Sequence, residues 1–186
     1  MLRARKRFPV IVLMFIIGLF FGMFITYSLS NRPVDIGENQ VLLLADRDYF
    51  EGIHSLLSEA RSSIHMVMFD IKYYPDYPES LVNSLLSDLE NAAARGVEVR
   101  IITDEYLTEK PVVRILKESG IDIKFDSGEV TTHSKLIIID SKIVILGSTN
   151  WSYHSIEKNH EANVVIHSSS FARQFEGYFE RIWMES

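Results

Sequence analysis

Two basic side chains stand two residues apart in the most distinctive stretch of the chain. His133 and Lys135 precede an aliphatic run, 136–139, that is typical of a buried strand. In an extended strand, residues at this spacing project from the same face, roughly 6–7 Å apart. An imidazole and an ammonium at that separation can hold one phosphate between them. The pair therefore predicts chemistry on a phosphate group.

A second pair with the same spacing follows the next apolar run. Ser148 and Asn150 are also two residues apart, and Gly147 before them permits a close approach of the backbone. Ser148 and Asn150 supply neutral hydrogen-bond donors, whereas Lys135 supplies positive charge. If the two strands are neighbours, these side chains together form a small pocket for an anion.

Glu161, at the start of the last expected strand, is the candidate for an acid that orients the imidazole. A carboxylate bonded to one ring nitrogen fixes the tautomer and leaves the other nitrogen to act as nucleophile or base. The chain has no cysteine, which excludes disulfides, thiolate zinc sites and cysteine nucleophiles. No pair among the histidines has a spacing that predicts a metal site.

An aromatic segment, 72–78, follows an expected strand and has two interpretations. It is either a packed loop or a wall of a substrate groove that stacks bases or contacts lipid. Trp151 and Tyr153, which follow the second pair, are candidates for the same wall. Asp104 and Glu105 at the end of another strand either bound the cleft or are solvated loop acids.

The surrounding pattern alternates short apolar strands with amphipathic helices. The expected strands are 41–44, 64–69, 97–103, 121–125, 135–139, 143–146 and 162–166. The expected helices are 47–61, one that starts near Pro78 and closes at Gly96, 111–119, and a C-terminal helix through Phe171, Phe175, Tyr178 and Ile182. Only residues 140–142 separate two of the strands, which predicts a hairpin. The fold class is therefore an α/β sandwich, a mixed central sheet flanked by helices.

The N-terminal part differs in composition from the rest. Residues 8–29 form a 22-residue run without a charged side chain, and as a helix this run is roughly 33 Å long, enough to cross a bilayer. A signal peptide has a shorter apolar region, and no clear cleavage site follows this one. We expect 1–7 to be a basic cytoplasmic N-terminus, 8–29 a transmembrane anchor, 30–40 a stalk and 41–186 the folded domain.

Charge is distributed unevenly along the chain. Four basic residues lie within the first seven and Arg32 follows the apolar run, so the positive-inside rule places the N-terminus in the cytoplasm and the folded domain outside it. The chain has 19 basic and 25 acidic residues, five of the basic ones and no acid lie in 1–32, and 33–186 therefore carries a net charge of −11. An acidic domain does not attract nucleic acid nonspecifically, so a local basic pocket must hold an anionic substrate.

The types and spacing of these residues resemble the signature of the phospholipase D superfamily, His-x-Lys-(x)4-Asp followed by Gly-Ser-x-Asn. The matching residues are His133, Lys135, Asp140, Gly147, Ser148 and Asn150. The segment 161–163 is similar to the family's downstream acidic element. The resemblance extends over roughly residues 41–184, and it points to the small single-motif members. These are bacterial phospholipase-D-like endonucleases and mitochondrial-surface relatives with an N-terminal membrane helix.

The resemblance implies a phosphodiesterase that needs no metal and no cofactor. One histidine attacks phosphorus to form a phosphohistidine, and a second protonates the leaving oxygen and then activates water. Family enzymes usually carry two motif copies and this chain carries one, which implies a homodimer whose two His133 side chains meet across a twofold axis. Lys135 and its dimer mate offset the phosphate charge. One histidine must be neutral and the other protonated, which favours neutral or mildly acidic pH.

Each motif residue has an expected role. His133, Lys135 and Glu161 are expected to be catalytic. Lys135, Ser148 and Asn150 are expected to bind the substrate phosphate. Asp140 lies seven residues after His133, an odd offset that places it on the other face of a strand and at the expected turn, so we expect it to be structural.

The sequence leaves the substrate open. The small size and single motif favour a nuclease-like hydrolase that takes a single strand more readily than a duplex, although the acidic domain counts against this. The alternative is a phospholipid phosphodiesterase, which the anchor would hold beside its substrate. A silent dimeric binding module is disfavoured, because binding alone requires neither the nucleophile nor its orienting acid.

Overall fold

The computed structural model describes residues 12–22, 41–107, 110–126 and 128–186. The chain divides into two units, Met1–Asp35 and Ile36–Ser186. In the first unit, residues 12–22 are helical. Within the described ranges, no helix combines the length and the apolar character that a membrane span requires.

Of the segment expected to be a membrane anchor, 8–29, only residues 12–22 lie within the described ranges. The flanking parts of 8–29, the basic segment 1–7 and the stalk 30–40 lie outside the described residues. The transmembrane assignment and the orientation of the chain stay predictions.

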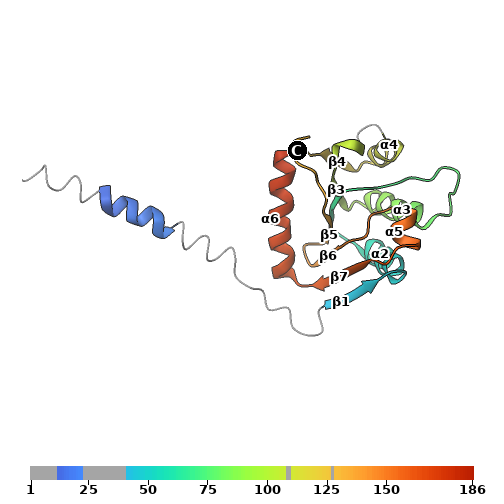
Figure 1. Ribbon diagram of the computed structural model, residues 1–186, viewed down its shortest axis with the longest axis horizontal. Coiled ribbons are helices and arrows are strands. Elements are labelled where there is room, and N and C mark those ends of the chain that lie inside the picture. Colours follow the sequence, from blue (N-terminus) through green and yellow to red (C-terminus); the bar gives the residue numbers. More distant parts are fainter. Residues whose placement is uncertain (1–11, 23–40, 108–109, 127) are drawn as a thin grey trace, which may run out of the picture. The chain divides into compact units, whose positions relative to one another are not determined.

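Seven strands of the second unit form one mixed sheet (Figure 1). They are β1 (Val41–Ala45), β2 (Ser63–Met68), β3 (Glu98–Thr103), β4 (Asp122–Phe125), β5 (Lys135–Ile139), β6 (Ile143–Gly147) and β7 (Ala162–His167). Their order across the sheet is β1-β7-β6-β5-β2-β3-β4. The pairs β2–β3 and β3–β4 are parallel, and the remaining pairs are antiparallel. The mixed sheet and the β5–β6 hairpin expected from the sequence are confirmed.

Helices cover both faces of this sheet. They are α2 (Asp48–Glu59), α3 (Leu81–Ala94), α4 (Pro111–Glu118), α5 (Tyr153–Glu157) and α6 (Ser169–Glu185), with a short 3₁₀ turn, η2 (Glu105–Leu107). Figure 1 shows α6 along one face and the other helices on the opposite face. The two faces carry separate hydrophobic clusters, one that includes α2, α3 and α4 side chains and one centred on Phe179 of α6. The predicted α/β sandwich is confirmed in this unit.

The start of α3 differs from the sequence expectation. The helix begins at Leu81 behind the N-cap Ser80, whose hydroxyl accepts a hydrogen bond from the Asn83 amide, whereas Pro78 was expected in its first turn. The Asn83 side chain also binds the backbone of Tyr74 and Tyr77, from 2.8 to 3.1 Å. These bonds hold the preceding segment as an ordered loop, which a local helix signal does not reveal.

The directions of the strands determine which loops lie at the same end of the sheet. Because β2, β3 and β4 run parallel and β5 runs opposite to them, the carboxyl ends of these three strands lie beside the amino end of β5. The antiparallel pairs of β6, β7 and β1 add the carboxyl ends of β6 and β1 and the amino end of β7. We call this end of the sheet the site end.

Candidate active site

The strand pattern brings most of the predicted site residues to the site end. Those that lie there are His133, Lys135, Ser148, Asn150 and Glu161. Lys135 begins β5, Ser148 follows β6, and Glu161 precedes β7. Residues from three separate strands of the sheet therefore meet in one place, whereas Asp140 lies at the opposite end.

His133 lies in the loop before β5. The expectation that it shares a strand face with Lys135 is therefore wrong. The His133 ring is exposed and packs against Phe69, with 4.6 Å between ring centroids. The Nζ atom of Lys135 lies 3.3 and 3.4 Å from the two ring nitrogens and donates a 2.7 Å hydrogen bond to the His133 carbonyl. The imidazole and the ammonium therefore do converge, because the flexible Lys135 side chain reaches back to the loop.

The ring of Phe69 packs against both the His133 imidazole and the Lys135 ammonium. Besides its contact with the imidazole, its ring centroid lies 5.1 Å from the Lys135 Nζ atom. Burial lowers the pKa of Lys135, whereas the negative charges of Glu161 and Asp70 oppose that shift. Phe69 was not among the residues predicted for the site. Its signal was a large aromatic residue at the last position of an expected strand.

Glu161 has different partners from those expected. Its carboxylate accepts a short hydrogen bond from the Ser148 hydroxyl and a 3.0 Å bond from the Asn159 amide. No hydrogen bond joins Glu161 to His133 within the part of the chain that the structure describes. The pairing of β6 with β7 places Ser148 beside Glu161, while His133 leans toward β2. The role of Glu161 in orienting the imidazole stays a prediction.

A buried amide ties down the segment that carries Ser148 and Asn150. Asn163, only 3% exposed, accepts a 3.3 Å bond from the Thr149 amide and donates to the Thr149 hydroxyl at 2.8 Å. Asn150 itself is half-buried, and its Oδ1 atom lacks a hydrogen-bond partner among the described residues. Asn163 thus fixes the backbone from which both proposed phosphate ligands project.

Gly147 does permit a close backbone approach, but the approaching segment is β7. A Cβ atom at this position would lie 2.5 Å from the Ala162 carbonyl oxygen and 2.6 Å from the Asn163 Cα atom. Backbone atoms cannot yield as a flexible side chain can. Any larger residue would therefore push apart the two strands that position Ser148 and Glu161.

Several acids surround the site end, most of them held by local bonds. Asp70 binds the Lys72 ammonium at 2.9 Å and accepts a short hydrogen bond from the Tyr106 hydroxyl. Asp104 is buried and accepts from the Tyr106 amide at 3.1 Å. Asp46 accepts from the Glu161 amide at 2.8 Å. The Asp104 side chain therefore supports the loop after β3.

The aromatic residues near the site divide into two groups. Trp151 is fully buried and donates a hydrogen bond to the Tyr49 hydroxyl at 3.1 Å, so it belongs to the core and not to a groove wall. Tyr153 is 37% exposed and Tyr77 65% exposed. The expectation of a groove wall therefore fails for Trp151, because the backbone of 151 pairs with Ile71 and turns the indole inward.

Asp140 ties the end of β5 to the segment that enters β2. Its backbone has a φ of 54°, and its carboxylate accepts hydrogen bonds from the amides of Arg61, Ser62 and Ser63 and from the Ser62 hydroxyl, between 2.7 and 3.1 Å. Burial opposes ionisation, but these donors together hold the pKa of Asp140 below its usual range.

We expect Asp140→Asn to lower the free energy of unfolding by about 1–3 kcal/mol, because an amide presents one oxygen in place of two to these donors. Asparagine tolerates the positive φ, so backbone strain is not added. A carboxyl group whose pKa is lower in the folded than in the unfolded state stabilises the folded state at pH values above its unfolded pKa. This contribution to the free energy of unfolding is lost as the pH falls. Urea unfolding at neutral pH and near pH 3 should therefore show a gap between wild type and variant that narrows at the lower pH. An equal gap at both values would contradict the assignment.

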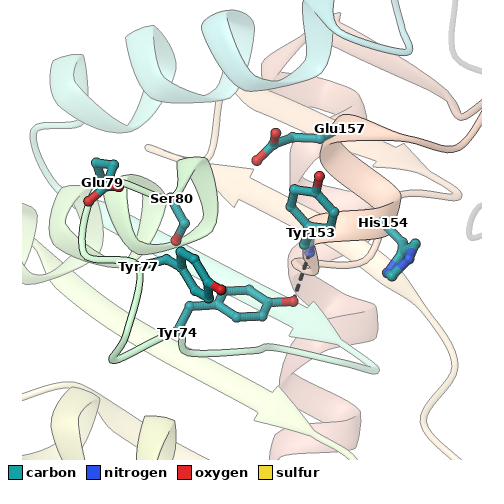
Figure 2. Close-up of a pocket in the computed structure, with 7 residues that line it drawn as sticks. All are labelled: Tyr74, Tyr77, Glu79, Ser80, Tyr153, His154 and Glu157. Atoms are coloured by element: carbon teal, nitrogen blue, oxygen red, sulfur yellow. Dashed lines mark hydrogen bonds between the residues drawn. The ribbon is translucent and has the colours of Figure 1, made fainter.

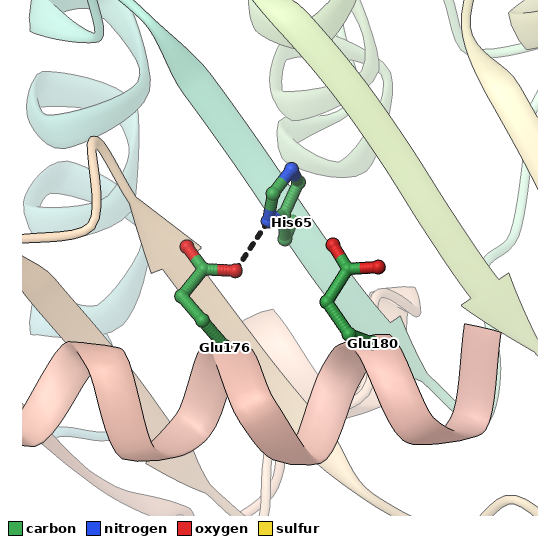
Figure 3. Close-up of side chains that lie close together, drawn as sticks. All are labelled: His65, Glu176 and Glu180. Carbon is green, nitrogen blue, oxygen red and sulfur yellow. Dashed lines mark hydrogen bonds and ion pairs between the residues drawn. The ribbon is translucent and has the colours of Figure 1, made fainter. Parts of the chain in front are cut away.

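One group of described side chains has the composition of a metal site: His65, Glu176 and Glu180, whose ligand atoms lie within 4.8 Å of one another (Figure 3). The possible ligand atoms of this group already have hydrogen-bond partners within the protein. His65 Nδ1 binds Glu176 at 2.6 Å, and its Nε2 accepts from Arg100 at 2.9 and 3.1 Å. Arg100 also binds Glu180 at 2.5 Å. With a guanidinium already between the ligands, this group fits an ion-pair network that holds α6 to the sheet.

Comparison with known proteins gives a consistent family match. A family model described as "Cardiolipin synthase, PLD-like domain" matches residues 53–183. The chain is 37% identical over 93 residues to mouse mitochondrial cardiolipin hydrolase, a match that covers 49% of this chain and 42% of that protein. It is 30% identical over 125 residues to a phospholipase D of Rickettsia conorii, covering 66% and 58% of the two chains. The chain therefore matches less than half of the mouse protein.

A solved structure shares the fold. Nuc from Salmonella typhimurium, described as a phospholipase D family member, superposes with a TM-score of 0.67 and 26% sequence identity. The match covers 78% of this chain and 94% of that one. The names of the two sequence relatives refer to phospholipids, and the solved structure is described as a phospholipase D family member.

Proposed function

Because this chain belongs to the phospholipase D superfamily, we propose that it is a phosphodiester hydrolase whose nucleophile is His133. The observation that carries the proposal is the contact of the exposed imidazole with the Lys135 ammonium at the site end. The imidazole attacks phosphorus, and the ammonium offsets the charge of the phosphate oxygens. Asn150, from the neighbouring strand end, supplies a further donor, and Ser148 can supply another only if its hydroxyl turns away from Glu161.

The proposed reaction has two steps. A ring nitrogen of neutral His133 attacks phosphorus, the bond to the leaving oxygen breaks, and the protonated His133 of the partner subunit gives its proton to that oxygen. The same imidazole of the partner then takes a proton from water, which attacks phosphorus and breaks the phosphorus–nitrogen bond. His133 is restored and a phosphomonoester is released. The reaction needs no metal, because Lys135 of each subunit faces the phosphate.

Two features favour a phospholipid as the substrate. A groove of about 330 Å³ lies beside Lys135 and is lined mainly by apolar side chains, among them Leu136, Leu146 and Phe175. Such a lining suits the apolar part of a lipid better than a sugar or a phosphate. The acids around the site end also repel the many neighbouring phosphates of a nucleic acid. They repel a lipid less, because its phosphodiester is isolated.

Single-stranded nucleic acid is the second candidate, as the size and single motif of the sequence indicate. It is favoured by the likeness to Nuc, which covers most of both chains. The N-terminal run, 8–29, favours the lipid, because a membrane anchor with the folded domain outside the cytoplasm would hold the site at a bilayer surface. Homodimerisation is part of the proposal, since one chain carries one motif.

The substrate can be tested by incubating the full chain in EDTA with phospholipid vesicles, single-stranded DNA and RNA. We expect release of a lipid headgroup product, with no requirement for a divalent metal. Cleavage of nucleic acid alone would overturn the lipid assignment and leave the hydrolase intact. Loss of all cleavage in EDTA, restored by a divalent metal, would contradict the metal-free mechanism. Full activity from a monomer in sedimentation would contradict the shared site.

A further inference from the structure

A second hollow, which we call the tyrosine pocket, lies between helix α5 and the loop that leads into α3 (Figure 2). Its volume is about 610 Å³. The side chains that matter for its chemistry are Tyr74, Tyr77, Tyr153, Glu79, Glu157 and His154. Tyr74, Tyr77 and Tyr153 were candidates for a wall of the substrate groove, but the linings of the tyrosine pocket and of the groove beside Lys135 share no residue.

The aromatic walls of the tyrosine pocket are held in place by their own hydrogen bonds. The Tyr74 hydroxyl accepts a 2.9 Å bond from the Tyr153 amide and so joins the loop to α5. Asn83 binds the amide and carbonyl of Tyr74 and the carbonyl of Tyr77. The backbone of the loop is therefore fixed before any ligand arrives, which reduces the entropy lost on binding.

The charge of the pocket is negative. Neither Glu79 nor Glu157 has a salt bridge or hydrogen bond within the described ranges. Glu79 stands next to the N-terminus of α3, whose dipole offsets part of its charge. Glu157 lacks that compensation, and Figure 2 shows it on the same helix as Tyr153, beside the space between helix and loop. Aromatic rings with a nearby unpaired carboxylate are the surroundings that stabilise a cation.

One ring of the pocket already contacts a cation. The Nζ atom of Lys158 lies 5.2 Å from the centroid of the Tyr153 ring. This distance lies within the range of about 6 Å in which the ring quadrupole attracts an ammonium group. Lys158 does not line the pocket, so it does not fill the space between the three tyrosines.

We propose that the tyrosine pocket binds an organic cation of the quaternary-ammonium type. Such a group has no N–H to donate and is bound by ring faces and a diffuse negative charge, which the pocket offers, and not by a set of converging acceptors. The same chemistry occurs in the headgroup of a zwitterionic phospholipid and in a free quaternary amine. The proposal does not depend on the reaction at His133.

The test is ligand-observed NMR on the full chain in a nonionic detergent, at about pH 8, where an ordinary imidazole is neutral. Tetramethylammonium is the first probe, and 3,3-dimethylbutanol, whose tert-butyl group has the shape of a trimethylammonium group, is the uncharged control. We expect saturation transfer from the protein to the methyl protons of the ammonium and little to the alcohol. Equal transfer to both probes, or none to the ammonium, overturns the proposal.

Variants localise the binding. Tyr77→Leu removes a ring that is 65% exposed and should weaken tetramethylammonium binding about threefold to tenfold, whereas Tyr77→Phe keeps the ring and should bind as wild type. Glu157→Gln should weaken binding by a similar factor. Glu118→Gln, on the exposed surface of α4, makes the same change of charge outside the pocket and should have no effect. Unchanged binding in both Tyr77→Leu and Glu157→Gln would show that the cation binds elsewhere and would overturn the assignment.

A second arm separates the two sources of the ammonium group. Soluble dihexanoyl phosphatidylcholine and dihexanoyl phosphatidylglycerol are compared on the His133→Asn chain, so that lipid hydrolysis does not interfere. Displacement of tetramethylammonium by the choline lipid alone supports a headgroup site. Displacement by neither lipid supports a site for a free quaternary amine. Displacement by both lipids equally overturns recognition of the ammonium group.

Discussion

His133→Asn should reduce hydrolysis of the phosphodiester substrate by at least about a thousandfold, the largest effect that we expect of any single substitution. Asparagine retains a polar side chain on the exposed loop but has no nucleophilic ring nitrogen. Because the imidazole is exposed and its partners within the described residues, Phe69 and Lys135, lie at the surface of the site, the thermal unfolding temperature should change little. The loss of rate is therefore separable from a loss of fold.

The intermediate gives a second measurement of the same prediction. Rapid quenching of the wild-type chain with a phosphorus-labelled substrate should trap an acid-labile label on the protein, as expected of a phosphohistidine, and His133→Asn should trap none. His54→Asn, on α2, removes a histidine whose ring binds Asp88 and that is not part of the proposed site, and it should keep both the label and the rate. Labelling of His133→Asn at the wild-type level would remove the nucleophile assignment.

Lys135→Met should lower the turnover rate by about a hundredfold to a thousandfold, the magnitude usual for loss of one group that stabilises transition-state charge. Methionine is similarly long and unbranched, so the change is mainly the loss of the charge, including the contact of the ammonium with the Phe69 ring. Lys135→Arg is the matched control. It retains the charge and should recover part of the rate, although its planar fork does not reproduce the geometry of an ammonium.

The pH dependence distinguishes the role of Lys135 from simple packing. Burial lowers the pKa of Lys135 in the folded chain, so the ammonium should lose its proton at a lower pH than an ordinary lysine, near 10.4. The wild-type rate, which already falls as the protonated histidine loses its proton, should therefore show a further decline below that value. In Lys135→Arg this decline should move to higher pH, because a guanidinium does not deprotonate in this range. An alkaline limb that is identical in the two proteins would assign it to another group.

Much of the fold could be predicted from local patterns in the sequence. Each of the seven expected strands appears within a residue of its expected bounds, because apolar runs and turn residues are properties of short segments. Helix boundaries were less accurate. The start of α3 is set by Asn83, which binds the loop before it, and α5 has only five residues and no clear period.

The candidate site was predictable in its composition and less so in its contacts. His133 and Lys135 meet through the long Lys135 side chain and not on a shared strand face, because His133 lies before the strand. The partner of Glu161 was not predictable, because it depends on the register between β6 and β7. Phe69 belongs to no motif, and its one signal was its place at the end of an expected strand. It reaches His133 because the pairing of β2 with β5 extends to the loop before Lys135.

By itself, the sequence determined the types and spacing of the reactive groups, the family, the alternation of strands and helices, and the acidic character of the domain. These are properties of neighbouring residues or of composition. Only the tertiary structure decided which loops share the site end, that Trp151 is core and Tyr153 is surface, and that Asp140 binds the amides of Arg61, Ser62 and Ser63. Those contacts join residues far apart in the chain, and strand order and register bring them together.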